Sequence, residues 1–159
     1  SGCLLLARNP KALKRFSAAF EARQVEKVYL GIVAGRLDQD SGTIALSLAK
    51  ISSAEKGWRM IPAKKGKPSV THWRKLQDIG GLTLVEFRPE TGRTHQIRVH
   101  AASGLGAPLL GDPVYGNPKG AARTMLHAAA LTIQRDGKPP IVAAASLPAD
   151  FAALGFSYA

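Results

Sequence analysis

The chain has 159 residues, 45% of them apolar, which fits one folded domain and excludes a disordered tail. Its single cysteine, Cys3, excludes an internal disulfide, and no apolar run approaches the ~20 residues that cross a bilayer. The net charge of +11 favours a polyanionic partner. Nucleic acid is favoured over an anionic membrane surface, because no strongly amphipathic basic helix supports the membrane alternative.

The N-terminal part of the chain predicts a strand, a helix and a second strand. Residues 4–7 read as a short buried strand. Asn9 is expected to cap the helix that follows, with Pro10 at its first position. Apolar side chains recur in that helix at helical spacing and are expected to line one buried face; they are Leu13, Phe16 and Phe20. The nearly continuous apolar run 28–33 predicts an interior strand that contains Tyr29.

The middle of the chain predicts a basic loop, two paired strands and a short helix. Residues 64–68 contain only Lys, Gly and Pro and indicate an exposed loop. Runs 70–76 and 82–87 predict two strands joined by a glycine turn. Thr94 is expected to cap a short helix that ends near residue 102.

The C-terminal part predicts a Gly/Pro-rich loop over 108–118 and a final short helix over 147–154. The periodicity of the apolar segment 125–133 does not decide its type, and prolines interrupt the tail at 139–140. Strands and helices mix without a regular β-α-β rhythm. This pattern favours a single α+β domain with a mixed, largely antiparallel sheet flanked by helices.

Metal and triad chemistry have little support in the sequence. Only His95 and His100 are close together, and their i, i+5 spacing does not place both on one helical face. No G-x-S-x-G elbow is present, and the glycine-rich stretches do not match a phosphate-binding loop. We therefore expect no metal and no cofactor.

Residues 92–100, GRTHQIRVH, concentrate polar and cationic side chains where a helix should pack into the fold. Arg98 lies between Ile97 and Val99, and a buried guanidinium needs an anionic partner. Two interpretations remain open: a structural ion pair, or a cation that holds a catalytic carboxylate or an RNA phosphate.

Three aromatic residues have two possible roles each. Tyr29 lies inside an apolar run, where a tyrosine usually belongs to the core, although a buried hydroxyl needs a partner. Trp58 and Trp73 can stack on nucleic-acid bases, but core packing is the favoured interpretation for both.

GRTHQIRVH resembles the third conserved motif of the RluA-type pseudouridine synthases. Three other stretches agree with this family in order and spacing. Residues 27–33, KVYLGIV, resemble its tyrosine motif, and residues 111–116, GDPVYG, resemble the loop after the third motif. Residues 126–128 and 147–151 resemble its C-terminal pattern. Each of these other motifs is weak evidence by itself. The resemblance is supported by the order of all the motifs together, which extends over nearly the whole chain.

The family's catalytic motif reads H-R-L-D-x-x-T-S-G, and this chain resembles it only from Ser1-Gly2 onward. The resemblance implies that the nucleophilic aspartate precedes Ser1. Residues 1–159 are then the C-terminal part of a catalytic domain and are inactive alone. No aspartate present has the motif's context; these are Asp38, Asp40, Asp78, Asp112, Asp136 and Asp150. Asp112 is the nearest rival, but its Gly-Asp-Pro setting is typical of a turn.

The resemblance implies an isomerase that converts uridine to pseudouridine in rRNA or tRNA. The target base leaves its stack, and its C–N glycosidic bond is exchanged for a C–C bond. Arg98 would pair with the nucleophilic aspartate, Tyr29 would pack against the flipped base and act as a base in proton transfer, and Leu126 would form an apolar wall. Tyr29 and Arg98 are expected to open into one cleft. RNA contacts are expected from a basic set: Lys27, Arg93, His95, Lys64, Lys65 and Lys67.

These inferences describe a monomeric, cytoplasmic RNA-modifying enzyme without a membrane segment or a small-molecule cofactor. The alternative is a non-catalytic RNA-binding module derived from the same fold. A structural ribosome-associated protein has only the positive charge in its favour.

Overall fold

The computed structural model describes all 159 residues and is built on one seven-stranded sheet, in the order β3-β2-β4-β5-β1-β6-β7. Its strands are β1 (Val25–Ala34), β2 (Ser41–Ser53), β3 (Gly57–Pro62), β4 (Lys67–Ile79), β5 (Leu82–Pro89), β6 (Leu126–Arg135) and β7 (Lys138–Ala144). Neighbouring strands are antiparallel throughout. The expected single α+β domain with a largely antiparallel sheet is confirmed.

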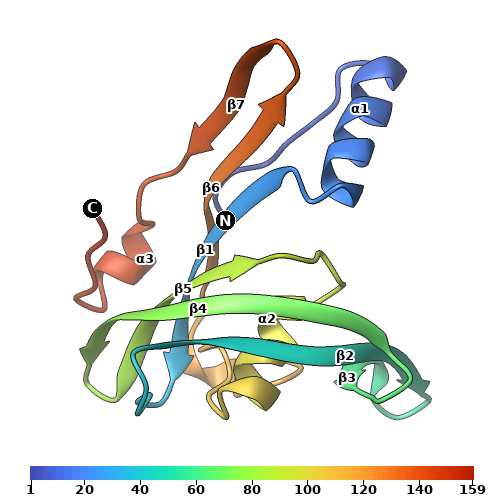
Figure 1. Cartoon of the computed structure of the whole chain (residues 1–159). Helices are drawn as coiled ribbons and strands as arrows, with labels where there is room; N and C mark the ends of the chain where they lie inside the picture. Colours follow the sequence, from blue (N-terminus) through green and yellow to red (C-terminus); the bar gives the residue numbers. More distant parts are fainter.

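The helical segments are few and mostly short. They are α1 (Pro10–Glu21), α2 (Gln96–Val99), the π-helical turn η1 (His100–Gly104), the 3₁₀ turn η2 (Pro118–Gly120) and α3 (Ala149–Ala152). Figure 1 shows α1 beside the β6–β7 hairpin at one end of the molecule, with β2 and β4 running across the other end. No helix is long and apolar enough to cross a membrane.

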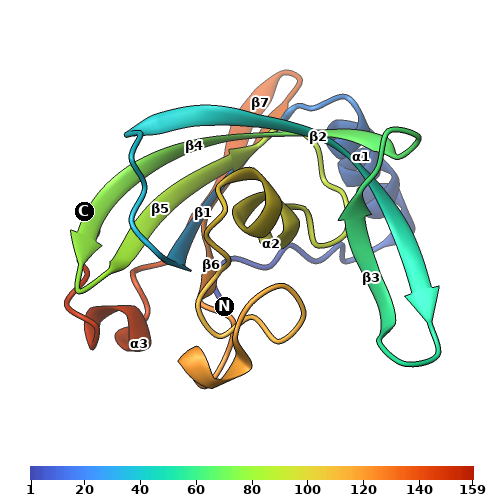
Figure 2. The same cartoon turned by 90° about the horizontal axis from the view of Figure 1, so that it is seen from below.

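The sheet curves around α2. Figure 2 shows α2 inside the arch that β2, β4 and β5 form. The main core cluster explains this position, because Ile97 of α2 packs with Val85 and Phe87 of β5 and with Trp73 of β4. A second cluster on the other face joins β1 to Phe151 of α3.

Strand β1 is buried on both faces, as its continuous apolar run predicts. It lies between β5 and β6, so Tyr29 is on an interior strand, paired with Phe87 on one side and Ala128 on the other. Gly31 permits close packing here, because a Cβ atom would come within 2.7 Å of the Leu109 side chain.

Several expected elements are present with shifted limits. Asn9 caps α1 through a side-chain oxygen that accepts the Ala12 N–H at 2.9 Å. The predicted pair 70–76 and 82–87 forms β4 and β5, joined through Gly80 and Gly81, both with positive φ. The undecided segment 125–133 is mainly strand β6.

The predicted strand over residues 4–7 is wrong. Only Gly2 forms a bridge, with Ala128 of β6, and the side chains of Leu4 and Leu6 are 81% and 74% exposed. The reason lies on the edge of β6. From Ala130 onward that edge is paired with β7, so no hydrogen-bonding partner remains for residues 4–7.

The predicted buried face of α1 is also largely wrong. Leu13 and Phe20 are exposed, and the small cluster below the helix contains Ala19, with Phe16 partly buried against it. Helix α1 packs on the end of the sheet, where little apolar surface is available. Helical spacing therefore marks the correct element but overstates what it buries.

Strands β2, β3 and β7 were not predicted. Prolines 139 and 140 suggested an interruption, yet both lie in β7, an edge strand that tolerates residues without an N–H donor. In β2 and β3 few residues are buried, and neither strand contains a long apolar run. Strand β2 pairs with β4, which is a long-range contact that local patterns do not reveal, and β3 pairs only with β2.

Candidate active site

One cleft of about 270 Å³ lies where β1, β5, β6 and α2 meet. All three residues assigned to chemistry by resemblance line it: Tyr29 from β1, Arg98 from α2 and Leu126 from β6. The expected convergence of Tyr29 and Arg98 on one cleft is confirmed. Ser1 lies next to this cleft, since its amino group is 3.4 Å from the Leu126 carbonyl oxygen.

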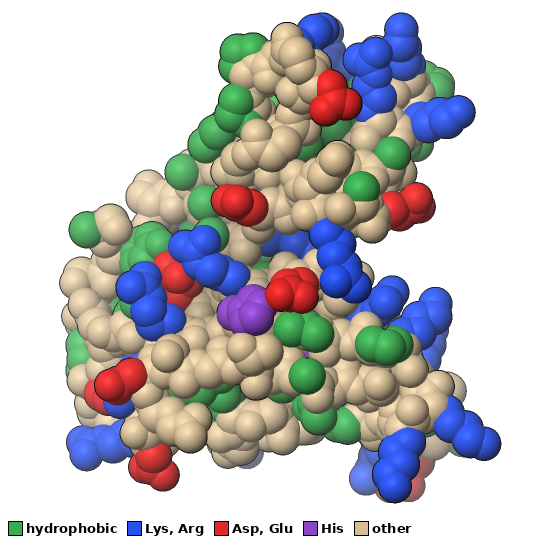
Figure 3. All heavy atoms as spheres, in the orientation of Figure 1, with side chains coloured by type: hydrophobic (Ala, Val, Ile, Leu, Met, Phe, Trp, Pro, Cys, Tyr) green, Lys and Arg blue, Asp and Glu red, His purple; other side chains and the backbone are tan.

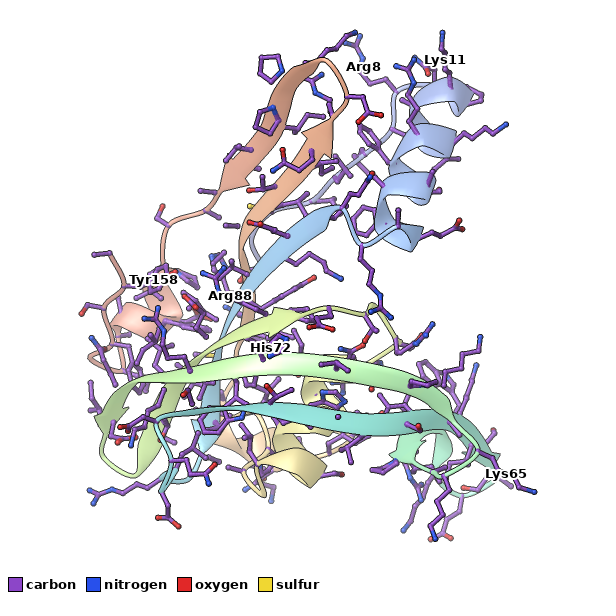
Figure 4. All side chains as sticks on the ribbon, in the orientation of Figure 1. Arg8, Lys11, Lys65, His72, Arg88 and Tyr158 are labelled. Carbon is purple, nitrogen blue, oxygen red and sulfur yellow. The ribbon has the colours of Figure 1, made fainter.

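Half of the expected RNA-binding set lines the same cleft: Lys27, Arg93 and His95. The other half does not, since none of Lys64, Lys65 and Lys67 lines it. Figure 4 shows Lys65 at the end of the β3–β4 connection, away from α2. Residues 64–66 form an exposed turn, and β4 already begins at Lys67.

The segment before α2 is held by a side chain rather than by a conventional cap. The predicted cap Thr94 is wrong, because His95 precedes the helix in the left-handed region with φ 54°. Gln96 substitutes for a cap. Its Oε1 accepts the Arg93 N–H at 3.0 Å and the Thr91 hydroxyl at 2.7 Å. A non-glycine residue at positive φ costs of the order of 1 kcal/mol and persists because its surroundings fix it.

A buried polar network attaches α2 and η1 to β4. Gln96 donates to the Val70 carbonyl and the Thr71 hydroxyl, and fully buried His100 lies between Ser69 and Thr71 at 2.8 Å from each hydroxyl. Burial lowers the pKa of His100 from 6.5 to about 4, so the ring is neutral at physiological pH. Gln96 and His100 of GRTHQIRVH therefore have a structural role, which no local pattern in the sequence indicates.

Arg98 has a carboxylate partner within the chain. Its Nε donates to Asp112 Oδ2 at 2.8 Å and its Nη2 to Asp112 Oδ1 at 2.7 Å. Asp112 is 0% exposed and also accepts the N–H groups of Val114 and Tyr115. Of the two interpretations that the sequence left open for Arg98, the structural ion pair is present, and its acid is Asp112. The expected turn-forming role of Asp112 is also present.

The electrostatics of this pair favour both charges. Burial alone would raise the pKa of Asp112, but hydrogen bonds from Arg98 and from two backbone N–H groups lower it below its usual value. Bonding to Asp112 raises the pKa of Arg98. A guanidinium carries five N–H donors and Asp112 uses two of them, so this cleft-lining side chain keeps donors that Asp112 does not engage.

Burial changes the two β1 side chains in the cleft. It raises the pKa of the Tyr29 hydroxyl, which is therefore protonated at neutral pH. It lowers the pKa of Lys27, whose Nζ donates to the Thr91 carbonyl at 3.2 Å. The cleft thus combines a phenol, an apolar wall and cations.

Aromatic rings extend from the cleft toward β3. The His95 ring stacks on Trp58 with centroids 4.8 Å apart and planes 20° apart. His95 Nδ1 is 2.9 Å from the Tyr115 hydroxyl, which also accepts the Met60 N–H at 2.9 Å. Trp73 is buried as expected, whereas core packing is wrong for Trp58, which is 45% exposed.

A second hollow of about 470 Å³ adjoins the first and shares Lys27 and Pro89 with it. Arg23, His72 and Arg88 contribute basic groups to it, together with Glu26 and Glu90. Figure 3 shows a notch with Lys and Arg side chains between the two ends of the molecule, and Figure 4 locates His72 and Arg88. No group of three or more His, Cys, Asp or Glu side chains is arranged to hold a metal ion.

Comparisons with known proteins agree with this geometry. Residues 1–103 match the family described as RNA pseudouridylate synthase. An uncharacterized RNA pseudouridine synthase of Zymomonas mobilis subsp. mobilis is 55% identical over 158 residues, which cover 98% of this chain and 72% of that protein. Ribosomal large subunit pseudouridine synthase D of the same organism is 37% identical and covers 84% of this chain and 42% of its own length.

A solved structure, human RNA pseudouridylate synthase domain containing 1, superposes with a TM-score of 0.74 at 31% identity. The match covers 89% of this chain and 62% of the human chain. This chain spans only 36% to 48% of the lengths of three further relatives, which are uncharacterized RNA pseudouridine synthases of Chloroflexus aurantiacus, Synechocystis sp. and Chlorobaculum parvum.

Proposed function

Because the chain belongs to the RNA pseudouridylate synthase family, a family of isomerases, we propose that it forms the cleft in which a flipped uridine of RNA becomes pseudouridine. The observation that carries this proposal is the convergence of Tyr29, Arg98 and Leu126, from three separate elements, on one cleft. The net charge of +11 supports RNA as the partner.

The cleft offers a place for each part of the flipped nucleotide. Tyr29 and Leu126 would enclose the uracil ring, since one supplies an aromatic face and the other an apolar wall. Lys27, Arg93 and His95 would contact the backbone near the target. Lys64, Lys65 and Lys67 would contact RNA farther from the target.

The nucleophile is proposed to be an aspartate of the family motif, outside residues 1–159. Asp112 is unsuited to that role, because its carboxylate is fully buried, accepts four hydrogen bonds and does not line the cleft. Arg98 would use its remaining N–H donors to keep the incoming carboxylate ionised and aimed. Asp112 would fix the guanidinium in the required orientation.

Tyr29 is proposed to act as the base in proton transfer as well as a packing surface. Since burial raises its pKa, ionisation at neutral pH is unfavourable and turnover should increase as pH rises toward its pKa. Tyr29→Phe keeps the ring, so RNA affinity should persist while turnover falls by about 10²-fold and loses this pH dependence. A Tyr29→Phe enzyme with wild-type turnover would restrict Tyr29 to packing.

The RNA class is proposed to be ribosomal, because a relative at 37% identity is named a ribosomal large subunit pseudouridine synthase. Transfer RNA is the other candidate. A cytoplasmic location and a monomeric state are part of this proposal. Mapping pseudouridines in a strain that lacks the gene decides between the RNAs. We expect loss of a site in rRNA, restored by the wild-type gene and not by Arg98→Lys.

Intact modification of all rRNA and tRNA in that strain would contradict the enzymatic proposal. The alternative, a non-catalytic RNA-binding module, would then remain. It has one structural observation in its favour: Arg98 is already neutralised by Asp112 within these 159 residues.

A further inference from the structure

Trp58 is an exposed aromatic residue joined to the cleft. It lies at the beginning of β3, is 45% exposed, and stacks on His95, which itself lines the cleft. Tyr115 contacts the edge of the His95 ring, with centroids 5.7 Å apart and planes at 82°. His95 is therefore fixed between two aromatic side chains, one of which reaches solvent.

The β2–β3 hairpin positions Trp58 rigidly. Trp58 pairs with Ser52 in the β-ladder, and Met60, further along β3, is buried with Leu48 and Val99. The N–H of Met60 is also bonded to the Tyr115 hydroxyl. Core packing therefore anchors β3 close to the indole and leaves the indole itself on the surface.

Positive charge accompanies this aromatic surface. Lys50 is exposed, and its Nζ is 4.6 Å from the centroid of the Trp58 ring. Arg93 lies in the cleft next to His95, with its Nε bonded to the Pro68 carbonyl at 3.1 Å. An aromatic face beside two cations suits single-stranded nucleic acid, whose bases stack on the ring while its phosphates pair with the cations.

We infer that Trp58 and His95 form a stacking platform for an unpaired RNA base next to the target uridine. This inference rests on the proposed function. The position of the platform indicates what binds it. The His95 ring belongs to both the platform and the cleft, so a nucleotide adjacent to the flipped uridine reaches Trp58. In the complex the base takes the place of the Lys50 ammonium on the indole, and Lys50 turns to a phosphate.

The chain provides its own probe, because it contains two tryptophans and only Trp58 is exposed. Titration with single-stranded oligouridylate should quench tryptophan fluorescence. An oligomer of equal length with abasic sugars keeps the phosphates and should not quench. Trp58→Ala should weaken oligouridylate binding roughly tenfold without changing the slope of log affinity against log salt. Trp58→Tyr, which keeps a stacking face, should stay close to wild type.

Wild-type affinity in Trp58→Ala, or equal quenching by the abasic oligomer, overturns the platform while leaving the proposed function intact. Failure of the wild-type chain to bind any RNA overturns both. A weakening in Trp58→Ala that is equal for oligouridylate and for the abasic oligomer also overturns the platform, because such an effect does not depend on a base.

Discussion

At the scale of single residues, the pair Arg98–Asp112 is the centre of the site. It joins α2 to the loop before η2 through two short hydrogen bonds, and it fixes a guanidinium that faces the cleft beside Tyr29. The motif GRTHQIRVH predicts the cation but not its partner within the chain. The reason is that nothing in the sequence between Arg98 and Asp112 predicts that the chain folds back to place these two side chains together. Gly-Asp-Pro is also common in turns, so Asp112 has an ordinary explanation without Arg98.

Breaking this pair should destabilise the fold more than breaking a similar pair at the surface. Asp112→Asn should lower the free energy of unfolding by about 3 kcal/mol, because it leaves a partly buried guanidinium without its anion. Asp150→Asn is the matched control, since Asp150 pairs with Arg123 in the same two-bond geometry but at the surface.

Urea unfolding of the two variants measures the difference. The surface variant should lose less than about 1 kcal/mol. Equal losses for Asp112→Asn and Asp150→Asn would show that burial of the first pair has no energetic importance.

His100 gives a prediction with a definite pH window. Its pKa is 6.5 when unfolded and about 4 in the fold, so only the unfolded chain takes up this proton between those values. Stability should therefore decrease as pH falls from 6.5 to 4, by about 3 kcal/mol in total from this group. His100→Gln should abolish this decrease of stability between pH 6.5 and 4, whereas the control His72→Gln, at an exposed position, should retain it.

Unfolding free energies measured across this window test the assignment. If wild type and His100→Gln lose stability in parallel, His100 is not the group that titrates. The two histidines of GRTHQIRVH also differ in kind, since His95 lines the cleft and His100 is sealed in the core. Their i, i+5 spacing already indicated different faces, but not which one faces the core.

At the scale of elements, local sequence patterns predicted the helices and strands that have a continuous signal of their own. They missed the strands that are defined by pairing with other segments of the chain. The run 28–33 predicted β1, and Asn9-Pro10 predicted the start of α1. Strands β2 and β3 were missed because β2 is defined by its pairing with the distant β4, and β3 by its pairing with β2. Trp58 was assigned to the core for the same reason, since its exposure follows from the position of that unrecognised hairpin.

The exposed turn before β4, together with Lys67 at the start of that strand, tests whether RNA binding extends beyond the cleft. Reversing the charges of Lys64, Lys65 and Lys67 should weaken RNA binding. The salt dependence should also decrease, by roughly 0.7 to 0.9 in slope for each phosphate that is no longer neutralised. An equal reversal on α1, at Lys11, Lys14 and Arg15, is the control for net charge. Figure 4 shows Lys11 and Lys65 at opposite ends of the molecule.

Affinity measured against salt concentration decides this point. An unchanged slope after the reversal at the turn would exclude that turn from the interface. Equal effects of both reversals would mean that the overall charge of +11, rather than a local interaction, determines affinity.

At the scale of the whole molecule, the seven-stranded sheet forms the fold, and the site lies where β1, β5, β6 and α2 meet. The fold class followed from the irregular mixture of strands and helices along the chain, and the shared cleft of Tyr29 and Arg98 followed from the family resemblance. The sequence did not reveal which of these residues are structural, because their roles depend on three-dimensional contacts. Gln96 and His100 hold α2 to β4, and Asp112 orients Arg98. The same motif GRTHQIRVH thus serves both packing and the cleft.

The most direct test of the central claim is pseudouridine formation by two purified proteins on one RNA that contains the target site. One is the chain of residues 1–159, and the other is a protein in which the H-R-L-D-x-x-T stretch of the family motif precedes Ser1. We expect pseudouridine only with the second protein, and its loss there on Arg98→Lys because lysine cannot form the two-bond contact with Asp112. Robust conversion by residues 1–159 alone would contradict the account, since none of its own aspartates is placed to act as the nucleophile.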